Sequence, residues 1–207
     1  MSSINLEAFR RTPLNSEPFP YLTIPKFVRS DVYATLSQDF PVVTKPGSFP
    51  VSELSVTPTF EQFLGELRST AVTQAFAKKF DVDLAQRPTM ITIRGMCRAK
   101  DGKIHSDSRS KLLTVLIYMN DIWPHKGGRL RLLRSVGDLN DMITEVEPGP
   151  GTMVAFLNTD SAWHGHTQYN GQRRAIQLNW VTDEGVVKRE QGRHRFSAKI
   201  KKLNPFV

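Results

Sequence analysis

The second half of the chain contains short apolar segments of strand length separated by turn-forming residues, and this pattern constrains the fold most. The segments are 90–98, 112–119, 129–133, 142–146, 152–157 and 174–181. Pro148-Gly149-Pro150-Gly151 is a strong turn signal, and Asn170-Gly171 is a favoured hairpin dipeptide. Many short strands joined by such turns are typical of an antiparallel sandwich or barrel, which is therefore the predicted core.

The first half of the chain is predicted to be helical. A helix is expected from Ser30 to about Phe40. Thr59 followed by Gln62 has the form of a capping box, and apolar residues then recur at helical spacing as far as Phe80. A helix with one apolar face must lie against an apolar surface. The pattern therefore predicts an α+β architecture with N-terminal helices packed on the β core.

The chain has the length of one well-buried domain. With 207 residues, two full domains would be a tight fit. We expect a single domain made of a helical part (1–88), a β core (89–183) and a basic C-terminal tail (184–207). No internal repeat or linker is visible in the sequence.

Charge and cysteine content bear on partners and location. The formal net charge is +8, and the tail from Lys188 to Lys202 is rich in lysine and arginine with Glu190 as its acid. Such a tail either contacts an anion such as nucleic acid or is solvated, and we favour the solvated alternative because it lacks an aromatic platform. No apolar run approaches the roughly 20 residues of a membrane helix. With the lone Cys97, this predicts a cytoplasmic protein that contacts no membrane.

The sharpest local signal for chemistry is His105-Ser106-Asp107. Residues two apart in extended chain project to the same side, so His105 and Asp107 can face one metal ion. With a second imidazole from elsewhere they would form a 2-His-1-carboxylate triad, which suits non-haem Fe(II) and leaves coordination positions open. A His-x-Asp triplet alone is a weak signal.

The second imidazole is expected from Trp163-His164-Gly165-His166, which follows an apolar strand. His125 lies in a glycine-rich turn and His194 in the basic tail, so both are poorer candidates. His164 and His166 have the same strand parity, and alternation alone does not separate them.

The last strand contains an arginine on its more apolar face. Arg174 shares a face with Ile176, Leu178 and Trp180, and we expect this face to point into the barrel. An inward arginine is costly unless an anion meets it, and a dicarboxylate would supply that anion. The alternative is a strand-end arginine that reaches water.

Together these features resemble the prolyl-hydroxylase-like branch of the 2-oxoglutarate/Fe(II) dioxygenases over residues 105–180. The resemblance rests on an ordered series of short matches. In chain order they are His105-Ser106-Asp107, Tyr118-Met119-Asn120, Gly127 to Leu132, Pro148 to Gly151, Phe156, His164, Gly171 to Arg174 and Trp180.

The resemblance implies roles for individual residues. In that branch an arginine follows the second ligand histidine and precedes the tryptophan at characteristic spacings. Arg173 and Arg174 fit the first spacing from His164, and only Arg174 fits the second, whereas the same count from His166 reaches residues that cannot bind a carboxylate. The implied metal ligands are therefore His105, Asp107 and His164. Arg174 and Tyr118 are the implied cosubstrate-binding residues, and His166 is an implied pocket-lining residue.

The resemblance also implies a double-stranded β-helix (jelly roll, cupin-like) and an activity. Fe(II), 2-oxoglutarate and dioxygen would hydroxylate a C–H bond, with succinate and carbon dioxide as co-products. The substrate is not identified; a peptide, a sugar or polysaccharide, and a small molecule stay open. Arg94, Arg98 and Arg129 are candidates for contact with an acidic substrate. Two alternatives remain, a non-catalytic jelly-roll module that binds a glycan or nucleic acid, and a cupin-type metal hydrolase or isomerase.

Overall fold

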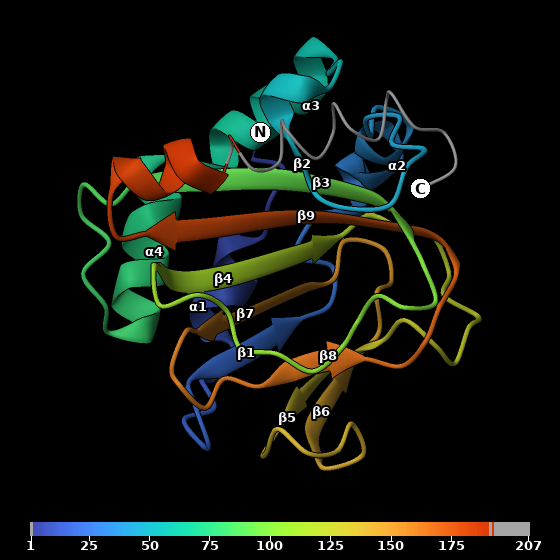
Figure 1. The fold of residues 1–207 in the computed structure, drawn as a ribbon. Coiled ribbons are helices and arrows are strands. Elements are labelled where there is room, and N and C mark those ends of the chain that lie inside the picture. Colours follow the sequence, from blue (N-terminus) through green and yellow to red (C-terminus); the bar gives the residue numbers. More distant parts are fainter. Residues whose placement is uncertain (1, 191, 193–207) are drawn as a thin grey trace.

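The computed structural model describes residues 2–190 and 192, which form helices on one side of a large antiparallel sheet (Figure 1). The labelled helices are α1 (Leu6–Arg11), α2 (Ser30–Gln38), a 3-10 turn η1 (Val51–Glu53), α3 (Pro58–Leu67) and α4 (Thr70–Phe80), and residues 184–190 are also helical. The strands are β1 (Tyr21–Ile24), β2 (Phe49–Pro50), β3 (Thr89–Cys97), β4 (Lys111–Tyr118), β5 (Leu130–Leu133), β6 (Met142–Val146), β7 (Met153–Leu157), β8 (His164–His166) and β9 (Gly171–Val181).

The strands form two antiparallel sheets. The large sheet has the order β1-β7-β4-β9-β3-β2, and the small sheet has the order β6-β5-β8 (Figure 1). Buried residues of both sheets pack together, among them Tyr118, Phe156, Leu130 and Leu132. Two antiparallel sheets that face each other, with helices outside, form the double-stranded β-helix, so the expected fold class is confirmed.

The helices cover the outer face of the large sheet. Their apolar residues join one core with Ile176, Leu178 and Trp180 of β9. The ring of Phe76 in α4 lies 5.2 Å from that of Trp180. Each face of β9 is therefore buried, one by helices and the other by the small sheet.

The predicted long helix ending at Phe80 is wrong in one respect, because the structure contains two helices there. Ser69 lies between the two helices and is the N-cap of α4, where its side chain accepts a hydrogen bond from the backbone N–H of Val72. Thr57 caps α3 in the same way through Phe60, so the predicted cap at Thr59 is also wrong. Serine and threonine at these positions satisfy N–H groups that a helix end leaves free.

The predicted strands lie where the sequence indicated, within a few residues at their ends. The sequence did not reveal β1 and β2, which come from the first part of the chain and join the edges of the large sheet. The first 88 residues are therefore not purely helical. Most of the basic tail lies outside the described residues. Within the described part of the chain, no helix combines the length and apolarity needed to cross a membrane.

Candidate active site

A cavity of about 480 Å³ lies between the two sheets. Its wall on the large sheet comes mainly from alternate residues of three neighbouring strands. The rest of the lining comes from β8, Leu130 of β5, the loop before β4, the two residues before β2 and Glu190. The residues from these three strands are Met90, Thr92 and Arg94 of β3, Lys111, Thr114 and Leu116 of β4, and Arg173, Ala175, Gln177 and Asn179 of β9. The polar face of β9 is thus the face that lines the cavity.

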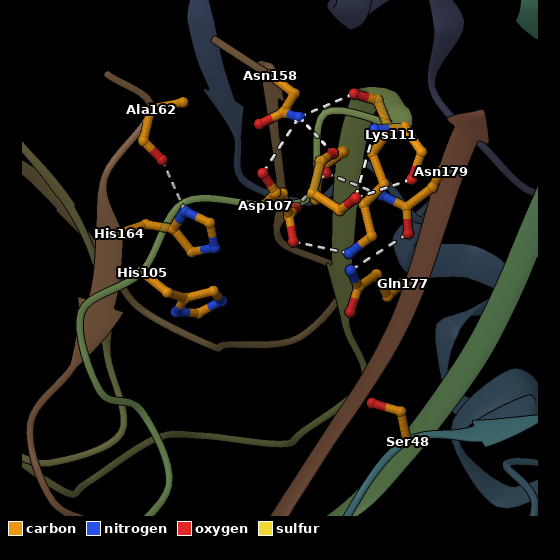
Figure 2. Close-up of polar contacts among 12 residues, drawn as sticks. Ser48, His105, Asp107, Lys111, Asn158, Ala162, His164, Gln177 and Asn179 are labelled. Carbon is orange, nitrogen blue, oxygen red and sulfur yellow. Dashed lines mark hydrogen bonds and ion pairs between the residues drawn. The ribbon is translucent and has the colours of Figure 1, made fainter. Parts of the chain in front are cut away.

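The structure brings His105, Asp107 and His164 together at this cavity, with one ligand atom from each lying within 4.8 Å of the others. His105 and His164 pair as an isolated antiparallel bridge, and each backbone N–H donates to the other residue's carbonyl oxygen at 3.0 and 2.9 Å. Figure 2 shows the two imidazole rings side by side and facing the space next to Asp107. This reciprocal bridge fixes two side chains that are 59 residues apart in sequence.

Backbone contacts leave one ring nitrogen of each imidazole available. The Nδ1 atom of His105 lies 2.9 Å from the carbonyl oxygen of Lys103, and Nδ1 of His164 lies 3.0 Å from that of Ala162. A carbonyl only accepts, so each Nδ1 carries a proton, and each Nε2 is the nitrogen left for a metal ion. Burial and the neighbouring His105 lower the pKa of His164 to about 4, which keeps this ring neutral at neutral pH.

Asp107 is held by two side chains of β4. Lys111 donates from Nζ to Oδ1 at 2.7 Å, and Thr114 donates from Oγ1 to Oδ2 at 2.6 Å (Figure 2). Asn179 in turn donates to Thr114 Oγ1 at 2.8 Å. Burial alone would raise the pKa of Asp107, but Lys111, the nearby His164 and these hydrogen bonds outweigh it and lower that pKa. The side chain is therefore an oriented carboxylate.

Arg173 and Tyr118 form a second polar centre in the same interior. Arg173 has an exposed fraction of 5% and lines the cavity. It donates to the carbonyl oxygen of Gly128 at 2.7 Å and to the Tyr118 hydroxyl at 3.2 Å. Burial raises the pKa of Tyr118, although the adjacent Arg173 opposes this. A buried guanidinium and a neutral phenol are suitable donors for a carboxylate.

The structure places Arg174 on the opposite face, which contradicts the sequence-based placement. Arg174 donates to the carbonyl oxygen of Ser37 at 3.2 Å, and its guanidinium lies 5.4 Å from the ring centre of Phe40. It does not line the main cavity. The apolar face of β9 packs against the helices, so the neighbouring Arg173 is the arginine that enters the barrel.

The other candidate residues separate into two groups. His166, Arg94 and Arg98 line the cavity. Burial, with the nearby Arg173 charge, lowers the pKa of His166 to about 4. Arg129 lies outside the cavity lining and forms a 3.2 Å ion pair with Glu147. His125 is exposed and contacts Trp123 and Tyr169, and His194 lies outside the described residues.

Two imidazoles and one carboxylate on one side of a cavity fit an Fe(II) ion. They are the donor set of non-haem iron oxygenases, and the cavity leaves room for further ligands. Sequence reasoning did not identify Lys111 and Thr114, which orient the carboxylate. The polar residues inside the otherwise apolar segment 112–119 were the available signal for Thr114.

Comparison with protein families gives one match. Residues 95–182 match the model of the 2OG-Fe(II) oxygenase superfamily. The matched range runs from β3 to the end of β9 and includes His105, Asp107 and His164. No curated protein matches the chain in sequence.

Solved structures with the same fold include enzymes of this superfamily. A prolyl-4-hydroxylase from Pseudomonas putida is 16% identical and has a TM-score of 0.59, with 88% of this chain and 97% of that chain covered. A prolyl 4-hydroxylase from Phytophthora capsici is 14% identical with a TM-score of 0.57 and coverages of 88% and 64%. An oxidoreductase of the 2OG-Fe(II) oxygenase family from Burkholderia pseudomallei is 13% identical with a TM-score of 0.51 and coverages of 78% and 84%. The expected resemblance is confirmed.

Proposed function

We propose that this protein, whose residues 95–182 match the 2OG-Fe(II) oxygenase superfamily, hydroxylates a C–H bond of its substrate and forms succinate and carbon dioxide. The family implies Fe(II) and 2-oxoglutarate as cofactors and dioxygen as the oxidant. The observation that carries the proposal is the convergence of His105, Asp107 and His164 on one cavity.

We assign His105, Asp107 and His164 as the Fe(II) ligands. The free Nε2 atoms and the lowered pKa values of Asp107 and His164 support this assignment, because a metal ion binds the ionised carboxylate and the neutral imidazole that these lowered pKa values favour. When bound, iron and 2-oxoglutarate together activate dioxygen for oxidation of a C–H bond. The contribution of the chain is to orient these groups and to keep them between two sheets.

We assign Arg173, with Tyr118, to the 5-carboxylate of 2-oxoglutarate in place of Arg174. Arg173 is buried on the cavity wall and has no carboxylate partner within the described part of the chain. A buried cation of this kind is stabilised when a ligand carboxylate arrives in a bidentate pair. The Tyr118 hydroxyl supplies a further polar contact at the same point.

The proposal is tested by anaerobic titration of the protein with Fe(II) and then 2-oxoglutarate. We expect a weak visible charge-transfer band from the chelate, and on admission of air a slow formation of succinate measured by NMR. A protein that binds metal but gives neither band nor succinate would contradict the proposal and favour a binding module or a metal hydrolase. Metal binding alone does not separate these three functions, whereas succinate does.

The substrate class can be approached from the solved structures. Two of those similar in fold are prolyl 4-hydroxylases, so a prolyl peptide is the first substrate to supply. Succinate formation above the level without peptide, together with a mass increase of one oxygen atom in the peptide, would identify a peptidyl substrate. Sugars and small acids are the next candidates.

Replacing Thr114 with valine is expected to weaken metal binding by about tenfold. The hydroxyl orients Asp107 through Oδ2, and loss of such a contact to a ligand typically costs about 10–100-fold in metal affinity. The measurement is Zn(II) affinity by competition with a chelator. Thr92→Val is the matched control, because Thr92 lines the same cavity from β3. Equal affinities of the two variants would contradict the assigned role of Thr114.

A further inference from the structure

Arg94 is a second cation on the cavity wall, and it is partly buried. Its pKa is lowered by burial and by the charge of Arg173. Its Nε donates to Ser48 Oγ at 2.7 Å, and within the ranges that the structure describes no carboxylate lies within ion-pair distance of it. A guanidinium carries five N–H donors, so most of those of Arg94 remain available. Burying such a group is unfavourable unless an anion meets it.

Arg98, from the end of the same strand region, lines the same cavity and has spare donor capacity. It forms an ion pair with Asp101 at 3.2 Å through Nη2. Its Nε is buried and has no hydrogen-bond partner among the residues described. Two arginines on one part of the wall therefore leave N–H groups unsatisfied.

Arg94 and Arg173 line the same face of the large sheet, but their hydrogen bonds hold them toward opposite edges of it. Arg173 is bound to Tyr118 of β4, on one side of β9. Arg94 is bound to Ser48, which directly precedes β2 at the opposite edge of the sheet. Figure 2 shows Ser48 across the cavity from His105 and His164, with its hydroxyl pointing into the space between. With Arg173 and Tyr118 assigned to 2-oxoglutarate, Arg94 remains for a different ligand.

The charge of the whole cavity favours an anion in addition to the cosubstrate. Six cationic side chains line it, against the three acidic ones Asp101, Asp107 and Glu190. The two charges of Fe(II) and those of 2-oxoglutarate cancel each other. The excess of positive charge therefore persists in the loaded enzyme, where a cleft with one sign of charge attracts its counterion.

We propose that the substrate carries an oxyanion, a carboxylate or a phosphate, which Arg94 and Arg98 bind at the Ser48 side of the cavity. This inference rests on the proposed function, because it concerns the substrate of the same site. The oxyanion occupies the free guanidinium donors, and the rest of the substrate then extends toward His105 and His164. Arg94 is a specificity-determining residue and takes no part in cosubstrate binding.

The test uses the full chain loaded with Zn(II), a redox-inert substitute for iron, and saturating 2-oxoglutarate. Ligand-observed NMR measures binding of N-acetylglycine and N-acetyl-L-proline, of the amide of each, and of inorganic phosphate. We expect one of the acids to bind at least about tenfold more tightly than its amide, or phosphate to bind, as a charge-assisted pair with arginine requires. If the acids bind and inorganic phosphate does not, the substrate carries a carboxylate. If phosphate binds and the acids do not, the substrate carries a phosphate.

Substitutions show whether Arg94 is responsible for the preference for an anion. Arg94→Met is expected to remove the preference for the anion and to change the Kd for 2-oxoglutarate less than about threefold. Arg109→Met is the control, because Arg109 lies outside the cavity, pairs with Asp160 and has an exposed side-chain fraction of 87%. This control should keep the preference of the wild type.

Three results would overturn the inference. In the first, acids and amides bind alike, or none binds, and phosphate does not bind. In the second, Arg94→Met keeps the preference. In the third, Arg94→Met weakens the binding of 2-oxoglutarate as much as Arg173→Met does, and Arg94 then belongs to the cosubstrate site. A wild-type protein that binds no 2-oxoglutarate at all contradicts the proposed function instead, so the two failures are distinguishable.

Discussion

Replacing Asp107 with alanine is expected to reduce Fe(II) affinity at least about 100-fold and to abolish succinate formation. The carboxylate is the anionic member of the proposed donor set, and only two imidazoles remain after its removal. The substitution also leaves the ammonium of Lys111 without its 2.7 Å partner, and this charge then repels the incoming cation. Both effects act in the same direction.

Chelator competition with Fe(II) under anaerobic conditions measures the loss of affinity, and NMR of succinate measures the loss of activity. Asp101→Ala is the matched control, because Asp101 lines the same cavity but lies outside the triad. It should keep wild-type metal affinity. If Asp107→Ala binds Fe(II) like the wild type, the assignment of the three ligands is wrong, even if succinate formation is lost.

The pairing of His105 with Asp107 was predictable because its sequence signal is local. The alternation of extended chain places His105 and Asp107 on one side, and their short separation makes the pair visible. The choice of His164 needed the resemblance, since His166 has the same parity. The structure places both histidines at the cavity, and only His164 forms the reciprocal bridge with His105.

The sequence-based placement of Arg174 inside the barrel was wrong because a general rule on burial was applied to β9. The rule that the apolar face of a strand points inward assumes a sheet with one solvated face. Here helices bury the face of β9 that contains Leu178 and Trp180, while the cavity is lined by the polar residues Gln177 and Asn179. In this sheet, which is buried on both sides, the polar face of β9 is the one that lines the cavity.

Two other errors concern a strand that pairs with a distant part of the chain and a helix cap. The short strand β1 is recognisable only through its pairing with β7, which lies more than 120 residues later. The division between α3 and α4 depends on Ser69 acting as a cap, and a serine within an apolar helical pattern does not by itself announce this role. Hydrophobic periodicity continues across both helices because both pack on the same sheet.

Replacing Arg173 with methionine is expected to raise the Kd of 2-oxoglutarate by about 100-fold, while Arg174→Met should change it less than about threefold. These adjacent arginines lie on opposite faces of β9, so the pair separates a role in the cavity from a contribution of charge alone. Removal of one member of a buried charge pair costs about 2–5 kcal/mol, and each 1.4 kcal/mol is about tenfold in Kd. Arg174 bonds instead to the carbonyl oxygen of Ser37.

The intensity of the charge-transfer band as a function of 2-oxoglutarate concentration gives the Kd of each variant. Arg173→Lys keeps the charge but loses the planar fork, so its Kd is expected to lie between those of the wild type and Arg173→Met. Thermal unfolding of each variant shows whether loss of the Gly128 contact has destabilised the fold. Our assignment of the carboxylate to Arg173 is wrong if Arg174→Met weakens the binding of 2-oxoglutarate and Arg173→Met does not. In that case the spacing to Trp180 identified the correct arginine.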